Sequence, residues 1–141
     1  MEFPFNIIVN SEEETTEIAI NFAKILLPSN IIAITGDLGT GKTFFVKAIA
    51  KYFGIDNVTS PTFSIVNTYT GKVKINHFDF YRIRKIEELY DIGFEEYLCD
   101  SSAITLIEWA EMFNEILPIN IFRIEIFHLG DSKREIKIKK N

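Results

Sequence analysis

Cysteine is almost absent from this sequence, which contains one, Cys99, in 141 residues. A single cysteine cannot close a disulfide within the chain, which fits a reducing compartment. The sequence also lacks an uninterrupted run of the roughly 18 apolar residues that a membrane-spanning helix needs. Its start, MEFPFNIIVN, has no basic region of the kind that begins a signal peptide. These absences predict a cytoplasmic protein without a membrane anchor.

Basic residues are outnumbered, with 15 Lys and Arg against 20 Asp and Glu and a net charge of −5. This balance argues against broad electrostatic capture of nucleic acid, which needs a basic face. The charge is uneven along the chain. Residues 86–100, IEELYDIGFEEYLCD, carry six acids and no base, whereas residues 133–140, KREIKIKK, are strongly basic. Solvated surfaces are the simplest interpretation of both segments.

Repeats, low-complexity tracts and linkers are also missing. An apolar content of 47% in 141 residues indicates one packed domain, residues 1–141, with a single core. Apolar or alternating segments predict strands at 5–9, 31–35, 63–69, 72–80, 103–109, 119–129 and 133–140. Helices are predicted at 11–27 and 42–53, with one or two short ones after Lys85. Helices and strands alternate early and hairpins come late, which predicts an α/β fold with a sheet of mixed direction.

Residues 36–43, GDLGTGKT, follow the apolar segment IIAIT and lead into the predicted helix at 42–53. The spacing Gly-x-x-x-x-Gly-Lys-Thr, between a strand and a helix, is that of a phosphate-binding loop (P-loop). Its glycines let successive backbone N–H groups point inward at phosphate oxygens, and the helix N-terminus adds the positive end of its dipole. Lys42 would neutralise the β- and γ-phosphates, and the Thr43 hydroxyl would join the coordination sphere of Mg²⁺.

A P-loop in this context predicts a P-loop NTPase-like fold, with three layers α/β/α around a mixed parallel and antiparallel sheet. The loop and the residue after it supply the predicted nucleotide-binding positions Gly36, Asp37, Leu38, Gly39, Thr40, Gly41, Lys42, Thr43 and Phe44.

Hydrolysis needs an acid besides the loop, to hold Mg²⁺ or to orient the attacking water. Glu108 ends the apolar strand ITLIE, where a fold of this kind delivers a carboxylate beside the P-loop, and Asp79 lies near a strand end in HFDFY. Each acid has a plainer interpretation, Glu108 as a surface acid and Asp79 as an ion-pair partner of Arg82. His77 has no Cys or second His at metal-ligand spacing, so we expect a structural role for it.

Four segments in this order and spacing, GDLGTGKTFF, VTSPTFSIVNTY, HFDFYR and LIEWAE, resemble the TsaE (YjeE) family of small bacterial P-loop ATPases. The resemblance covers nearly the whole chain, from EEET at 12–15 to EW at 108–109. Many families share the P-loop, whereas SPTF and HxDxYR make the match specific. The family has IEWPE where this chain has IEWAE, so Ala110 relaxes the turn after Trp109 but removes no chemical group.

This resemblance implies an ATPase required for the threonylcarbamoyl modification of adenosine 37 (t6A37) in tRNAs that read ANN codons. Its ligands would be ATP, ADP and Mg²⁺. Lys42, Asp79 and Glu108 would be the catalytic residues. Thr43 and Glu108 would share the Mg²⁺, and Asp79 would stand near the γ-phosphate as a water-orienting or second carboxylate.

The family pattern implies further nucleotide contacts. Thr62, in SPTF, would lie in a switch-like loop close to the nucleotide, and Trp109 would lie beside the site. Adenine contacts are the least specified, with candidates at Asn10, Ser11, Lys133 and Arg134.

By the same resemblance, the chain would bind two related partner subunits, TsaB and TsaD, and hydrolyse ATP chiefly when engaged with them. Turnover would reset that complex between rounds of modification, and tRNA would be reached only through the complex. No obvious arginine finger stands near the P-loop, which fits a weak ATPase completed by a partner. The acidic segment 86–100, with Glu95 and Glu96 near its centre, is the candidate docking surface.

Two other functions stay open. A small-molecule P-loop kinase usually carries an arginine-rich lid, whereas the region after Asp79 is acidic, with only Arg82 and Arg84 close by. A nucleotide-dependent binding module would hold ATP without turnover. A GTPase is disfavoured because the sequence has no guanine-reading Asn-Lys-x-Asp motif.

Overall fold

The computed structural model describes residues 1–61 and 64–141. Its strands are β1 (Phe5–Val9), β2 (Ile31–Thr35), β3 (Val66–Thr70), β4 (Lys74–Asp79), β5 (Ala103–Glu108), β6 (Phe122–Gly130) and β7 (Lys133–Lys140). Its helices are α1 (Glu12–Ala23), α2 (Lys42–Tyr52), α3 (Glu87–Asp91) and α4 (Phe94–Leu98), with a 3₁₀ segment η1 (Ala110–Ile116).

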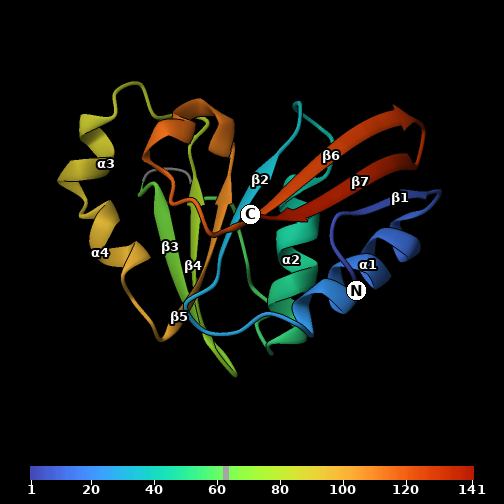
Figure 1. Cartoon of the computed structure of the whole chain (residues 1–141), viewed down its shortest axis with the longest axis horizontal. Coiled ribbons are helices and arrows are strands. Elements are labelled where there is room, and N and C mark those ends of the chain that lie inside the picture. Colours follow the sequence, from blue (N-terminus) through green and yellow to red (C-terminus); the bar gives the residue numbers. More distant parts are fainter. Residues whose placement is uncertain (62–63) are drawn as a thin grey trace.

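The seven strands form one sheet in the order β1-β7-β6-β2-β5-β4-β3 (Figure 1). The central strands β6, β2, β5 and β4 run parallel to one another. The outer pairs β3–β4, β6–β7 and β1–β7 are antiparallel. The expected α/β fold with a mixed sheet is therefore confirmed, and so are both predicted hairpins.

Strand β2 lies in the middle of this sheet and is buried along almost its whole length. Ile32 and Ile34 pack into the core that contains Phe22 of α1 and Phe45 of α2. Ala33 points to the opposite face, into a second core. An unbroken β-branched apolar segment is what a strand covered on both faces requires.

The second core is built from aromatic rings on the face covered by α3, α4 and η1. Phe94 of α4 meets Phe78 edge to face, with ring centres 5.1 Å apart, and meets Phe80 at 5.6 Å. Leu89 of α3 and Ala110 of η1 are buried in the same cluster. Helices thus cover both faces of the sheet, α1 and α2 on one and α3, α4 and η1 on the other.

Several predicted boundaries were wrong. The helix predicted at 11–27 ends at Ala23, five residues before Pro28, and the N–H of Ile25 bonds back to Phe22 in a turn. The strands predicted at 63–69 and 72–80 are Val66–Thr70 and Lys74–Asp79, and the helix predicted at 42–53 ends at Tyr52. The strand predicted at 103–109 stops at Glu108, because Trp109 has a φ of 57° and turns the chain. The strand predicted at 119–129 begins only at Phe122.

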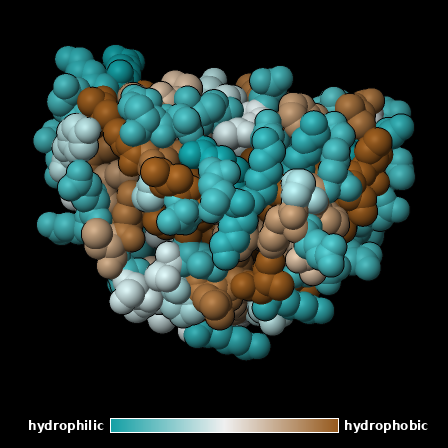
Figure 2. Space-filling model, in the orientation of Figure 1, coloured by the Kyte–Doolittle hydropathy of each residue, from teal (hydrophilic) through white to brown (hydrophobic). Residues whose placement is uncertain are grey.

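Among the described residues, no helix is both long enough and apolar enough to cross a membrane. Figure 2 shows one face of the molecule, on which hydrophilic side chains predominate and apolar ones lie in small separate groups.

Candidate functional site

The carboxyl ends of three neighbouring parallel strands place the site. Ile34 of β2 is opposite Glu108 of β5, which is in turn opposite Asp79 of β4. The segment after β2 is the glycine-rich loop, residues 36–41, which leads directly into α2. The loop and the two predicted acids therefore meet at one edge of the sheet, where ligands of open α/β sheets bind.

The loop adopts a conformation that its glycines permit. Gly39 and Gly41 have φ values of 80° and 104°, in the left-handed region that costs glycine little. Gly41 is the N-cap of α2, no side chain caps this helix, and its first turn contains no acidic residue. The positive end of the α2 dipole is thus left to act on an anion.

The Lys42 side chain is folded over the loop and is only 5% exposed. Its ammonium donates to the carbonyl oxygens of Gly36, at 2.5 Å, and Asp37, at 2.8 Å, and lies 4.0 Å from the centre of the Trp109 ring. Burial lowers the pKa of Lys42 below its ordinary value, and the carboxylates of Glu111 and Glu108 oppose that shift. An anion bound at the loop would favour the charged ammonium and so offset the cost of burying it.

Thr43 and Glu108 are joined directly. The Thr43 hydroxyl donates to Oε1 of Glu108 at 2.8 Å, and since it has one proton, its oxygen accepts in the 3.1 Å contact with the Ser60 hydroxyl. Glu108 is only 2% exposed, and its second oxygen, Oε2, lies 2.5 Å from Nε2 of His77. Both oxygens of this buried carboxylate are thus hydrogen-bonded.

Asp79 lies across the site from the loop. Its Oδ1 accepts from the backbone N–H of Tyr81 at 3.0 Å. The pKa of Asp79 is raised, first by burial and further by the negative charge of Glu108. Within the described chain no salt bridge joins Asp79 to Arg82, so the plainer interpretation as an ion pair is not supported.

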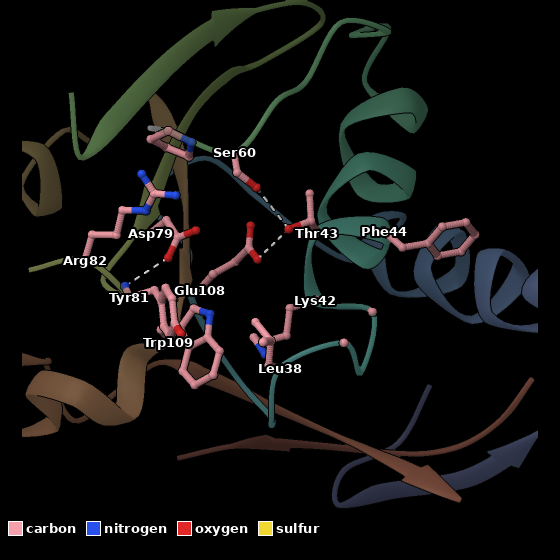
Figure 3. A pocket seen from close by; sticks show the side chains of 13 residues that line it. Leu38, Lys42, Thr43, Phe44, Ser60, Asp79, Tyr81, Arg82, Glu108 and Trp109 are labelled. Atoms are coloured by element: carbon pink, nitrogen blue, oxygen red, sulfur yellow. Dashed lines mark hydrogen bonds between the residues drawn. The ribbon is translucent and has the colours of Figure 1, made fainter. Parts of the chain in front are cut away.

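These side chains surround a cavity of about 450 Å³ (Figure 3). Its lining residues are Leu38, Gly39, Gly41, Lys42, Thr43, Phe44, Ser60, Pro61, Asp79, Tyr81, Arg82, Glu108 and Trp109. Tyr81 and Trp109 pack against each other on its wall, with ring centres 4.7 Å apart.

Arg82 was missed as a site residue by sequence reasoning. The sequence showed no obvious arginine finger near the P-loop, and Arg82 lines the same cavity as the loop. The reason is local: the chain turns directly after β4, with Tyr81 bonded back to Asp79, and so brings Arg82 to the mouth. The available signal was its place in HFDFYR, three residues after Asp79.

A smaller cavity of about 200 Å³ adjoins the first, and Gly41 and Phe44 line both. It is also lined by Glu12, Thr15, Thr40, Asp131, Ser132 and Arg134. The Arg134 guanidinium donates through Nε to the carbonyl of Thr40 at 2.9 Å, which ties strand β7 to the loop. An elongated ligand seated on the loop can therefore extend between α1 and the β6–β7 hairpin.

Comparison with known proteins gives a consistent result. The family model of the threonylcarbamoyl adenosine biosynthesis protein TsaE matches residues 9–136. The chain belongs to the TsaE family. It is 46% identical to TsaE of Rickettsia bellii, over 90% of this chain and 89% of that protein, and 38% identical to TsaE of Aquifex aeolicus, over 98% of each. The crystal structure of Bacillus subtilis YdiB superposes with a TM-score of 0.80 at 31% identity, covering 100% of this chain and 88% of that one.

The positions that the TsaE pattern assigns to nucleotide or metal fall in different places. Five of the P-loop positions line the main cavity, together with Phe44, Asp79, Glu108 and Trp109. Thr40 lines the smaller one, whereas Gly36 and Asp37 line a third cavity behind the loop, with Glu111.

Three of the predicted adenine contacts, Asn10, Ser11 and Lys133, line neither the main cavity nor the smaller one. The backbone N–H of Asn10 donates to Oε2 of Glu14. The Ser11 side chain caps α1 by accepting from the N–H of Glu14 at 3.1 Å. Lys133 is exposed at the start of β7, and its neighbour Arg134 reaches the cavity instead. Contacts of Ser11 and Lys133 with a nucleotide stay predictions, and Thr62 lies outside the described residues.

Proposed function

We propose that this chain is the ATPase component of the tRNA t6A37 modification machinery. It binds ATP with Mg²⁺ in the main cavity and hydrolyses it when engaged with TsaB and TsaD. The observation that carries the proposal is the meeting of Thr43 and Glu108, 2.8 Å apart, beside Lys42 on the loop. Membership of the TsaE family supports the cellular role.

The residues fit a magnesium ion that arrives with its nucleotide. Among the described residues, no group of three or more His, Cys, Asp or Glu side chains gathers to hold a metal unaided. Mg²⁺ is usually held by one or two carboxylates together with substrate phosphates and water. Glu108 and Thr43 would supply the protein ligands, and the bound ion would neutralise charge on the phosphates.

The remaining side chains take complementary roles. Lys42 exchanges the two loop carbonyls for phosphate oxygens, and the free N–H groups at the start of α2 hold the same anion. Asp79 accepts a hydrogen bond from the attacking water through the oxygen that Tyr81 does not use. Arg82, on the cavity wall, can balance charge that develops as the phosphoryl group departs.

The smaller cavity suits the nucleoside end of ATP. Phe44 lies between the two cavities and offers an aromatic surface to a base. Glu12, Thr15 and Arg134 supply acceptors and donors around it. Adenine recognition would therefore come from the start of α1 and the β6–β7 hairpin.

The mouth of the main cavity has features of a surface that a partner covers. Leu38, at the tip of the loop, is 74% exposed, and Tyr81 is also exposed at the rim. Exposed apolar side chains around an open site fit association with TsaB and TsaD. ATP turnover would then depend on their binding, and tRNA contact would come through the complex in the cytoplasm.

The deciding experiment measures phosphate release from ATP by the chain alone and with TsaB and TsaD. We expect turnover to rise on adding both partners. Glu108→Gln should lower the stimulated rate by at least about tenfold, the lower bound for loss of even an indirect metal contact. Glu115→Gln, at an exposed position outside the cavity, is the matched control and should keep the wild-type rate.

Other outcomes point elsewhere. Binding of ATP without phosphate release, even with both partners, would indicate a nucleotide-dependent binding module. Transfer of the phosphoryl group to a nucleoside or sugar would indicate a kinase.

A further inference from the structure

Among the described residues, His77 is the one fully buried titratable side chain beside the site to which the proposed chemistry gives no role. It lies on β4, two residues before Asp79, with 0% of its surface exposed. Its Nε2 is 2.5 Å from Oε2 of Glu108, and the other oxygen of that carboxylate accepts from Thr43.

On the sheet, His77 has two apolar neighbours and one amide neighbour. Alternation along β4 places it on the same face as Ile75, and its register partners are Leu106 of β5 and Asn67 of β3. Both apolar residues belong to the core that α2 covers. In the described part of the chain, Nδ1 of His77 has no hydrogen-bond partner. The hydrogen bond to Glu108 is therefore the polar contact made by the His77 ring.

That contact fixes where the proton must be. A carboxylate oxygen only accepts, so Nε2 carries the hydrogen and donates it to Oε2. In a neutral ring with the hydrogen on Nε2, the unpartnered Nδ1 is an acceptor, which is less costly to leave unpaired than a donor. A histidine retained only for packing would gain nothing from this arrangement over an apolar side chain of similar size.

We propose that His77 is a positioning residue for the metal-binding carboxylate of Glu108. By holding Oε2, it fixes the rotation of the carboxylate so that Oε1 faces Thr43 and the phosphate-binding loop. The proposal rests on the proposed Mg–ATP site. Hydrogen-bond partners that hold a metal ligand from behind typically contribute roughly 10- to 100-fold to metal affinity.

The test compares two amide variants of matched polarity. Glutamine at position 77 extends its amide N–H about as far as Nε2 of histidine, whereas asparagine stops near Nδ1 and falls short of Glu108. The measurement is Mg²⁺ titration of a fluorescent ATP analogue bound to each protein, with EDTA as the metal-free reference. The control is Asn76→Ala, which removes a buried side chain of the same strand that accepts from Thr68 and does not contact Glu108.

We expect His77→Asn to raise the Mg²⁺ half-saturation by about tenfold or more, with metal-free analogue affinity unchanged. His77→Gln should recover most of the loss, and Asn76→Ala should match wild type. Should His77→Asn fail to give a folded protein, His77→Leu replaces it, since it also lacks the donor and fills the apolar site.

An unchanged half-saturation in the variants that lack the donor would overturn the proposal, as would an equal loss in Asn76→Ala. A wild-type protein that binds the analogue equally well with and without Mg²⁺ would instead refute the metal site itself, and the role of His77 with it.

Discussion

The hydroxyl of Thr43 donates a 2.8 Å hydrogen bond to the carboxylate of Glu108, although the two residues are 65 positions apart in the chain. Thr43 lies in the first turn of α2 and Glu108 ends β5, so the bond links the phosphate-binding loop to the next strand of the sheet. The two groups proposed to share a metal ion are therefore adjacent.

Replacing the Thr43 hydroxyl should separate metal binding from nucleotide binding. Thr43→Val keeps the shape of the side chain but removes the oxygen, so Mg²⁺-dependent ATP affinity should fall about tenfold while metal-free affinity is retained. Thr43→Ser keeps the oxygen and should resemble wild type. Isothermal titration with and without Mg²⁺ would measure both, and equal behaviour of the two variants would contradict the metal assignment.

The raised pKa of Asp79 predicts an acidic limb in the pH–rate profile. Only the ionised carboxylate can accept from the attacking water, so turnover should fall as the pH drops through this raised pKa. Asp79→Asn should bind ATP normally, lose most turnover, and lack that limb in its residual rate. A wild-type limb that persists unchanged in Asp79→Asn would assign it to another group.

The same shift has a consequence for stability. Because the folded-state pKa is above the unfolded value, the folded protein binds more protons between the two values, and stability falls as the pH rises through that window. At a pH above both pKa values, the folded protein bears the full free-energy cost of the ionised Asp79. Asp79→Asn should therefore raise the melting temperature at neutral pH, and the gain should fade as the pH falls from the raised pKa to the ordinary aspartate pKa. Thermal unfolding at a series of pH values tests this.

Gly36 cannot accept a side chain without moving the loop. A Cβ there would lie 2.6 Å from the carbonyl oxygen of Ile126 and 2.7 Å from the Thr40 hydroxyl. Gly36→Ala should weaken ATP binding by roughly 10²-fold through displacement of the loop. Gly54→Ala is the control, since its φ of 83° brings backbone strain of about 1–2 kcal/mol but its Cβ meets open space. Gly54→Ala should lose stability and keep ATP affinity.

Arg82 and Arg84 form a natural comparison. Both side chains are exposed, but Arg82 lines the main cavity and Arg84 does not. Arg82→Ala should lower the partner-stimulated rate by roughly 10²-fold with little change in ATP affinity, as expected for a group that acts on developing charge. Arg84→Ala should match wild type. Equal rates in both variants would place the required arginine on a partner.

Docking of the partners on the acidic segment 86–100 stays a prediction. Five of its six acids lie on α3 and α4, which cover the opposite face of the sheet from α1 and α2. Reversing Glu95 and Glu96 to lysine should weaken capture by the TsaB–TsaD pair and leave ATP binding intact. Matched reversal of Glu13 and Glu17, which are exposed on α1 and line neither the main nor the smaller cavity, controls for net charge. Unchanged capture would remove this surface from consideration.

The sequence predicted those parts of the site whose residues are close together in the chain. The residues from Gly36 to Thr43 are fixed relative to one another by a strand, a turn and a helix start, and each signal is local. Glu108 was accessible for a related reason, because it ends an apolar strand and strand ends meet at one edge of a parallel sheet.

Features that depend on distant segments were not predicted. The pairing of His77 with Glu108 requires the register of β4 on β5, which the sequence pattern does not define. The position of Arg82 in the cavity wall depends on the direction of the turn after β4. The cavity beside Phe44 forms only if the β6–β7 hairpin lies next to α1. In each case the contact joins segments that are not related by any local pattern in the sequence.

The contact of Lys42 with Trp109 has a practical consequence. The sequence contains one tryptophan, and its ring lies 4.0 Å from the ammonium that a phosphate must attract. All indole emission from the protein therefore originates at this point. Fluorescence of the unlabelled chain can report, in real time, the arrival and departure of whatever ligand draws the lysine away.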